Sequence, residues 1–166
     1  MRDIHVTDVE AGSEASFTAF VREAEGPIRR ALVAGFGLEV GRDAAEEALV
    51  HAWQHWDRVS TMENPRGYVY RVGHRTAQKL ARRRQRPLAL PEVPATVGPT
   101  LVEPGLPAAL SALTRQQRTV VVLACGYGLS QSDTARLLGI TRSSVQRHLE
   151  RGLAKLRHEL GVMVDV

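Results

Sequence analysis

Cysteine, aromatic residues and long apolar runs are all scarce in this chain of 166 residues, and each scarcity excludes a class of protein. The single cysteine, Cys125, excludes an internal disulfide and a cysteine-rich zinc site. No apolar run approaches the roughly 18 residues that are needed to cross a bilayer, and the polar, acidic N-terminus does not resemble a signal peptide. We therefore expect a cytoplasmic protein without membrane insertion.

Charged residues are plentiful but unevenly distributed along the chain. The 22 Lys+Arg and 18 Asp+Glu give a net charge of +4. Residues 1–63 hold 6 basic and 12 acidic side chains and carry −6, whereas residues 64–166 hold 16 basic and 6 acidic side chains and carry +10. This division predicts two surfaces for two different partners, and a polyanion is the expected partner of the basic surface.

Apolar residues recur at three- and four-residue steps through the first half of the chain, and no alternating strand pattern accompanies them. The segments 17–28, 42–57 and 64–80 are predicted to be helices, and Pro27 is expected to kink or end the first of them. These segments predict a small all-helical domain over residues 1–86.

The third of these helices has a clear start signal, because Asn64 can serve as the N-cap and Pro65 as the first helical residue. Seven basic side chains and no acidic one follow between Arg71 and Arg86. Tyr70 lies off the apolar face and is expected to be the exposed aromatic residue that could stack on an unpaired base. The helix predicts contact with a phosphate backbone, and a solvated charged face is the alternative. Its shared basic face comprises Arg71, Arg75, Lys79 and Arg82.

Proline is concentrated in one stretch, since six of the eight prolines lie between residues 87 and 107. Prolines at this density remove backbone donors and bias the preceding residues toward extended conformations. We expect residues 87–106 to form a Pro-rich linker between two domains, with an irregular loop packed on one domain as the alternative. The second domain then covers residues 107–166.

The second domain contains the pattern of a helix-turn-helix. Ser130 opens a short helix, Gly139 supplies the turn, and Thr141 caps a longer amphipathic helix that buries Val145 and Leu149. The second helix of this motif can lie in the major groove, where Gln pairs with adenine and Arg with guanine. A helical hairpin with a solvated basic face is the alternative. The candidate DNA-contacting residues are Arg142, Ser143, Ser144, Gln146, Arg147 and, toward the phosphates, Arg151.

Metal binding and catalysis have little support in the sequence. His51 and His55 stand one helical turn apart after Glu47, a spacing that could hold a metal, but HAWQH lacks the glutamate of the metalloprotease motif and no third ligand is evident. Cys125 lies in an apolar run and is expected to pack in the core. No phosphate-cradling glycine loop and no nucleophile–base pattern can be recognised. We expect neither a cofactor, nor a metal, nor an enzyme.

The order of these motifs resembles the bacterial RNA polymerase sigma factors, specifically the extracytoplasmic-function class (group 4 of the sigma-70 family), which has only the region 2 and region 4 domains. DAAEEALVHAWQHW looks like the family's DxVQExFLRAW helix, and NPRGYVYRVGHRTAQKLARRRQR resembles its NPRAWLYRIARNLALDHLRRR stretch. The chain from LPAAL to LAKLR is similar to region 4 almost throughout. The resemblance covers nearly the whole chain and implies an all-α fold with a region 2 helical bundle and a region 4 helix-turn-helix.

The resemblance also implies roles for individual residues. The acidic second helix would bind the clamp coiled coil of the polymerase's largest subunit through Asp43, Glu46, Glu47, Val50 and Trp53. The loop from Asp57 to Asn64 and the helix after it would engage and open the −10 element through Arg66, Tyr70, Arg71, Arg75, Lys79, Arg82, Arg83 and Arg84. The −35 element would be read by the helix that begins at Arg142.

These implications predict an alternative sigma factor whose partners are core RNA polymerase and promoter DNA. An anti-sigma factor is a further partner that the family resemblance suggests. Two alternatives stay open on the sequence: a sigma-derived helix-turn-helix regulator that binds DNA without supporting initiation, and an interaction protein whose first domain sequesters a partner.

Overall fold

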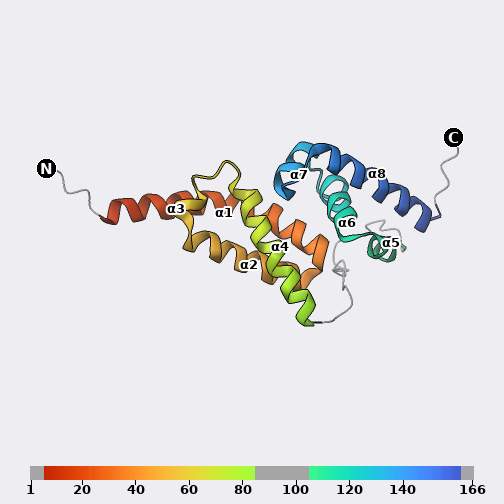
Figure 1. The fold of residues 1–166 in the computed structure, drawn as a ribbon, viewed down its shortest axis with the longest axis horizontal. Helices are drawn as coiled ribbons and strands as arrows, with labels where there is room; N and C mark the ends of the chain where they lie inside the picture. Colours follow the sequence, from red (N-terminus) through yellow and green to blue (C-terminus); the bar gives the residue numbers. More distant parts are fainter. Residues whose placement is uncertain (1–5, 85–104, 162–166) are drawn as a thin grey trace, which may run out of the picture.

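The computed structural model describes residues 6–84 and 105–161, and the regular structure within them is helical (Figure 1). The first domain contains α1 (Val6–Phe36), α2 (Leu38–Gln54), α3 (Trp56–Val59) and α4 (Pro65–Arg84). The second domain contains α5 (Leu106–Ala112), α6 (Arg115–Val121), a π-helical turn (Val122–Gly126), α7 (Gln131–Leu138) and α8 (Arg142–Glu159). The predicted all-helical class is confirmed, and most of the predicted linker lies outside the described residues.

Helix α1 continues through Pro27, so the prediction that this proline could end the helix is wrong. The same face is buried on both sides of the proline: Ala24 lies before it, Ile28 and Leu32 lie after it, and all three are 0% exposed. This face packs against α2 and α4. Burial of a continuous apolar face therefore outweighs the hydrogen bond that a proline removes from a helix interior.

Small residues allow the three long helices of the first domain to cross closely. A Cβ atom added at Gly41 of α2 would lie 2.5 Å from the backbone of Val33 in α1. A Cβ atom at Gly73 of α4 would lie 2.7 Å from Cδ1 of Leu32. The same crossings are filled by buried alanines of α2, namely Ala44, Ala45, Ala48 and Ala52.

Turns fix the ends of these helices. Gly37, with φ at 86°, adopts a conformation that favours glycine, and α2 begins directly after it, four residues earlier than predicted. The N–H of Gly67 donates to Oδ1 of Asn64 at 3.0 Å, which confirms the predicted cap of α4.

The helix boundaries of the second domain follow its caps closely. Thr114 and Gln117 form a reciprocal capping box at the start of α6. The hydroxyl of Ser130 accepts from the N–H of Asp133 at 3.0 Å, and Gly139, with φ at 66°, ends α7 in the left-handed conformation. Thr141 then caps α8 by accepting from the N–H of Ser144 at 3.1 Å. The predicted helix-turn-helix is therefore formed by α7 and α8.

Cys125 does not pack in the core as expected, because it is exposed. It lies in the π-helical turn, where the wider turn changes the faces that successive residues occupy. Leu123 in the same turn is 0% exposed. Within this apolar run, Leu123 therefore belongs to the core and Cys125 does not.

The two domains lie against each other rather than apart. Helix α6 packs on α1, and α7 packs on α4. In Figure 1 the second domain lies beside the end of the first that is remote from the N-terminal part of α1. One continuous cluster of buried residues includes Leu32 and Val69 of the first domain and Val120, Leu138 and Val145 of the second.

Candidate protein and nucleic-acid interfaces

Helix α2 presents an exposed face that is both acidic and apolar. We call it the α2 face and define it by Asp43, Glu46, Glu47, Val50 and Trp53, the residues predicted to contact polymerase. Val50 is 56% exposed and Trp53 is 46% exposed, whereas most of the other large apolar residues in the described ranges are covered. The Trp53 ring packs partly on Phe17 of α1, with 4.9 Å between ring centroids. Exposed apolar groups among carboxylates are typical of a protein-binding surface.

The buried side of α2 explains why Trp53 is available for contact. Trp53 and Trp56 are three residues apart, a spacing that places neighbouring side chains on one face of a helix. In the structure only Trp56 is buried, at 7% exposure, and its indole N–H donates to Oγ of Ser16 at 2.7 Å. Phe17 and Phe20 of α1 lie 5.1 and 5.0 Å from the Trp56 ring centroid. These three aromatic rings fill the space, so Trp53 stays at its edge.

Two arginines assigned to the −10 region form ion pairs with acidic residues of neighbouring helices. Nη2 of Arg84 lies 2.7 Å from Oδ2 of Asp43, and its Nη1 lies 3.4 Å from Oε2 of Glu39. Nη2 of Arg66 lies 2.7 Å from Oε2 of Glu23. Arg84 thus joins the end of α4 to the α2 face.

The connection between α3 and α4 is held by polar contacts that the sequence analysis did not identify. The hydroxyl of Tyr68 lies 3.2 Å from Nε2 of His51 and accepts from Nη2 of Arg58 at 2.9 Å. The Thr61 hydroxyl donates to the carbonyl of Arg58 at 2.9 Å. Partial burial, followed by the charges of His55 and Arg58, lowers the pKa of His51. These contacts join α2, α3 and α4 and position the loop from Asp57 to Asn64.

Helix α4 presents an exposed basic face along its length. Its members recur at helical spacing on the side away from the first-domain core, and each is exposed. We call this set the α4 basic face: Arg71, Arg75, Lys79, Arg82 and the adjacent Arg83. Its geometry suits successive contacts to phosphates.

Tyr70 is not the exposed aromatic residue that the sequence analysis expected, because it is only 5% exposed. Its ring lies 5.9 Å from that of His74, and its burial raises the pKa of Tyr70 to about 12. Helix α4 is covered by α1 and α2 on one side and by α7 on another, so a residue off the apolar stripe is still enclosed. The position does not support stacking of Tyr70 on an unpaired base.

One side of helix α8 is exposed from its first turn onward, and the opposite side packs against the second domain. Val145 is 0% exposed, and Gly152 and Leu156 are also buried. A Cβ atom at Gly152 would lie 2.7 Å from Cγ2 of Val121, so α8 crosses α6 closely. The exposed side, which we call the α8 recognition face, comprises Arg142, Ser143, Gln146, Arg147 and Arg151.

Hydrogen bonds organise several polar side chains of this helix. The Ser144 hydroxyl lies 2.8 Å from that of Thr141, within the cap, so it is engaged at the helix end. Nε2 of Gln146 donates to Oε1 of Glu150 at 2.9 Å. Partial burial, followed by the charges of Arg147 and Arg151, lowers the pKa of His148. A lowered pKa favours the neutral form of His148, whereas the arginines and Lys155 of α8 carry positive charge.

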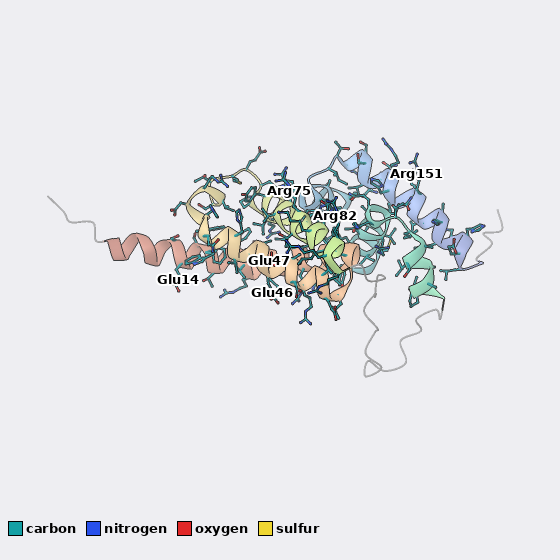
Figure 2. The ribbon with its side chains drawn as sticks, turned by 60° about the horizontal axis from the view of Figure 1, so that its bottom comes forward. Glu14, Glu46, Glu47, Arg75, Arg82 and Arg151 are labelled. Atoms are coloured by element: carbon teal, nitrogen blue, oxygen red, sulfur yellow. The ribbon has the colours of Figure 1, made fainter. Side chains whose placement is uncertain are left out.

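The labelled acidic side chains of α2 lie on a different side of the molecule from the labelled basic side chains of α4 and α8 (Figure 2). In Figure 2 the labelled Glu46 and Glu47 of α2 lie toward the bottom, whereas Arg75 and Arg82 of α4 and Arg151 of α8 lie toward the top. The charge division in the sequence therefore corresponds to a division in space. It falls inside the first domain, between α2 and α4.

Within 6–84 and 105–161, no three His, Cys, Asp or Glu side chains are grouped as metal ligands would be. The His51 and His55 rings lie 4.3 Å apart between centroids. Among the described helices, none is long and apolar enough to cross a membrane.

Comparison with known proteins agrees with this arrangement. A family model for sigma-70 region 2 matches residues 41–87, and one for sigma-70 region 4 matches residues 105–156. An RNA polymerase sigma-E factor of Streptomyces avermitilis is 32% identical over 129 residues, which are 72% of this chain and 70% of that protein. A sigma-E factor of Streptomyces antibioticus is 31% identical over 129 residues, 72% of this chain and 69% of that protein.

A solved structure shares the fold across both domains. It is the sigma factor RpoE of Bartonella quintana in complex with the anti-sigma factor NepR, with a TM-score of 0.66 and 19% sequence identity. The match covers 90% of this chain and 99% of that one. Given the two curated relatives and the two matching regions in the expected order, the chain belongs to the sigma-70 family of RNA polymerase sigma factors, with the two-region composition of its extracytoplasmic-function class.

Proposed function

We propose that this protein is an alternative sigma factor, which binds core RNA polymerase and directs it to a limited set of promoters. The observation that carries the proposal is the presence, in one chain of this family, of an acidic protein-binding face beside two separate basic faces. A DNA-binding regulator needs only the basic faces. An initiation factor needs a polymerase contact as well.

Each face receives one role in this proposal. The α2 face binds the polymerase clamp, with Trp53 and Val50 as its apolar centre and the carboxylates around them. The α4 basic face contacts the phosphates of the −10 element. The α8 recognition face reads the −35 element in the major groove, with Gln146 and Arg147 directed at base edges.

Three residues that were predicted to contact the −10 element are already engaged or enclosed in the structure. Arg66 and Arg84 are held by carboxylates, so phosphate contact by either requires an ion pair to open. Tyr70 is buried, so this proposal does not include stacking of its ring on a base of the −10 element. Strand opening involves no covalent step, since protein contacts to phosphates and unstacked bases offset the cost of unstacking. We therefore propose an initiation factor without catalytic activity of its own, acting in the cytoplasm with polymerase.

Domain boundaries and a further partner complete the proposal. We assign residues 1–86 to region 2, 87–106 to the linker and 107–166 to region 4, with α5 beginning at Leu106 in the described residues.

The related RpoE structure contains an anti-sigma factor. We propose that a regulator of this kind also binds the present chain.

The test uses purified core polymerase from the source organism, with and without the chain, on fragmented genomic DNA. Mapping the 5′ ends of the transcripts should reveal start sites that depend on the chain and share two upstream elements. Specific DNA binding without such transcripts would support the helix-turn-helix regulator instead. A W53A variant serves as the control that retains the DNA-binding faces.

A further inference from the structure

One acidic side chain lies in the middle of the α8 recognition face. Glu150 follows Gln146 by four residues and Arg147 by three, and all three side chains are exposed. At about 100° per residue, Glu150 lies between the other two, about 40° from Gln146 and about 60° from Arg147 around the helix axis. Val145, which is 0% exposed, lies on the far side of the helix. A carboxylate at this position faces any DNA that the neighbouring arginine contacts.

The charge of Glu150 is not neutralised by the basic residues around it. Within the described parts of the chain it forms no ion pair, and its Oε1 accepts a hydrogen bond from Nε2 of Gln146 at 2.9 Å. A carboxylate close to phosphates lowers affinity for every DNA sequence, because like charges repel. Discrimination between sequences results when one base edge offsets this cost with a hydrogen bond and the others do not.

The major-groove edges of the four bases differ in what they offer to a carboxylate, which only accepts hydrogen bonds. Guanine presents O6 and N7 as acceptors, and thymine presents O4 and a methyl group, so neither supplies a donor. Adenine presents its N6 amino group beside the N7 acceptor. Cytosine presents its N4 amino group without an acceptor on the same edge. Cytosine is therefore the base that suits the Glu150 carboxylate best.

The hydrogen bond to Glu150 also orients the amide of Gln146. Because the carboxylate has no proton to donate, the nitrogen of the amide points toward Glu150 and Oε1 points away from it. A second N–H and Oε1 stay available, and these are the donor and acceptor that pair with N7 and N6 of adenine. The two residues are one helical turn apart, about 5.4 Å, and base pairs are about 3.4 Å apart, so the two side chains reach neighbouring base pairs.

We propose that Glu150 is a specificity-determining residue of α8, which accepts a hydrogen bond from N4 of a cytosine in the −35 element and holds Gln146 in the orientation that reads a neighbouring adenine. The inference rests on the proposed role of α8 in reading that element. It adds a residue that selects bases by excluding those without a donor. The expected signature is a C·G pair beside an A·T pair in the DNA that this helix contacts.

Other roles for Glu150 lead to different results. Polar pairs four residues apart stabilise helices, so a structural role predicts that loss of Glu150 lowers the thermal midpoint and leaves the preferred bases unchanged. A role through charge alone predicts that loss of Glu150 raises affinity for all DNA by the same factor. Contact with a base predicts a change of the preferred pair at one position.

The test is selection from promoter DNA in which the −35 element is randomised. Holoenzyme reconstituted from core polymerase and the full chain binds the library in one arm, the full chain alone binds it in the other, and bound DNA is sequenced. The variants are E150A, E150Q and Q146A. E159Q is the matched control, because Glu159 is the other acidic residue of α8, is also exposed, and lies half a turn around the axis and about 13 Å along it. Circular dichroism and thermal unfolding check the fold of each variant.

The wild type and E159Q should prefer a C·G pair at one position by about 5- to 150-fold over the other pairs. E150A should reduce this preference to less than about 2-fold, while affinity for unrelated DNA rises by about 2-fold or more because a negative charge is removed. E150Q should change the preferred pair at the same position from C·G to A·T, since glutamine pairs with adenine. Q146A should lose the A·T preference at the neighbouring position.

Three results would overturn the proposal: E150A and E150Q variants that select the same pairs as the wild type, a Glu150-dependent position that is A·T in the wild type, or an E159Q variant that changes the selected sequence as E150A does. If only the chain alone enriches a sequence, the proposed sigma function fails, and the variants in that arm still decide the role of Glu150. Enrichment of no sequence in either arm would contradict both proposals.

Discussion

Truncation of Trp53 to alanine should weaken binding to core polymerase strongly while leaving the chain folded. Trp53 is 46% exposed, so on the order of 100 Å² of its surface is available to a partner. At about 25 cal/mol per Å², covering this surface contributes roughly 2–3 kcal/mol. The dissociation constant of W53A should therefore rise about 30- to 150-fold.

The assay is titration of core polymerase against fluorescently labelled chain, with thermal unfolding of each variant measured in parallel. Because Trp53 also packs on Phe17, with 4.9 Å between centroids, W53F keeps a ring at that contact and should give an intermediate loss. Replacement of the exposed Val50 by alanine should give a smaller loss in the same direction. A folded W53A variant that binds core polymerase as tightly as the wild type would refute the role of the α2 face.

Three further predictions concern the other surfaces and the core. R147A should weaken the binding free energy at a cognate −35 site by about 1–3 kcal/mol and relax the base preference at one position. Unchanged affinity and base preference would show that Arg147 does not contact a base. Replacing Arg82 and Arg83 together should lower the slope of log binding constant against log salt concentration by up to about 2 for promoter binding. R84A should change this slope less, because the Arg84 side chain is paired with carboxylates. Equal changes in slope would contradict this difference. G41A should destabilise the first domain by about 1–3 kcal/mol in chemical denaturation, because the new methyl group would lie 2.5 Å from the backbone of α1; an unchanged midpoint would contradict the close crossing.

Local signals in the sequence predicted helix starts well, because a cap is formed by groups only a few residues apart. Asn64, Ser130 and Thr141 each occupy the cap position that the sequence indicated. Gly139 likewise takes the left-handed conformation that the turn requires. The order of these local signals also carried the family resemblance, which the comparisons bear out.

Tertiary contacts account for the predictions that were wrong. Pro27 did not end α1 because the residues after it, Ile28 and Leu32, are buried against other helices. The periodic pattern could not distinguish Tyr70, which the helices packed against α4 bury, from Trp53, which stays exposed, because the exposure of each depends on what packs against its helix. Cys125 is exposed because a π-helical turn interrupts the regular spacing.

Contacts between the domains were beyond sequence reasoning altogether. Arg118 and Ala34 are 84 residues apart, and no local pattern in the sequence pairs them. The ion pair between Arg84 and Asp43 similarly joins residues that were assigned to different partners. Basic composition identified the surfaces that DNA could contact, but only the structure shows which of those cations are already held by carboxylates.

Run-off transcription from a single mapped promoter tests the central claim most directly. Core polymerase alone should give no defined transcript, and core polymerase with the chain should give one of the expected length. Scrambling the −35 element or using W53A should each abolish most of that product, because DNA reading and polymerase binding belong to separate faces. A transcript that is equally abundant without the chain, or that is unaffected by both changes, would contradict the assignment of this protein as a sigma factor.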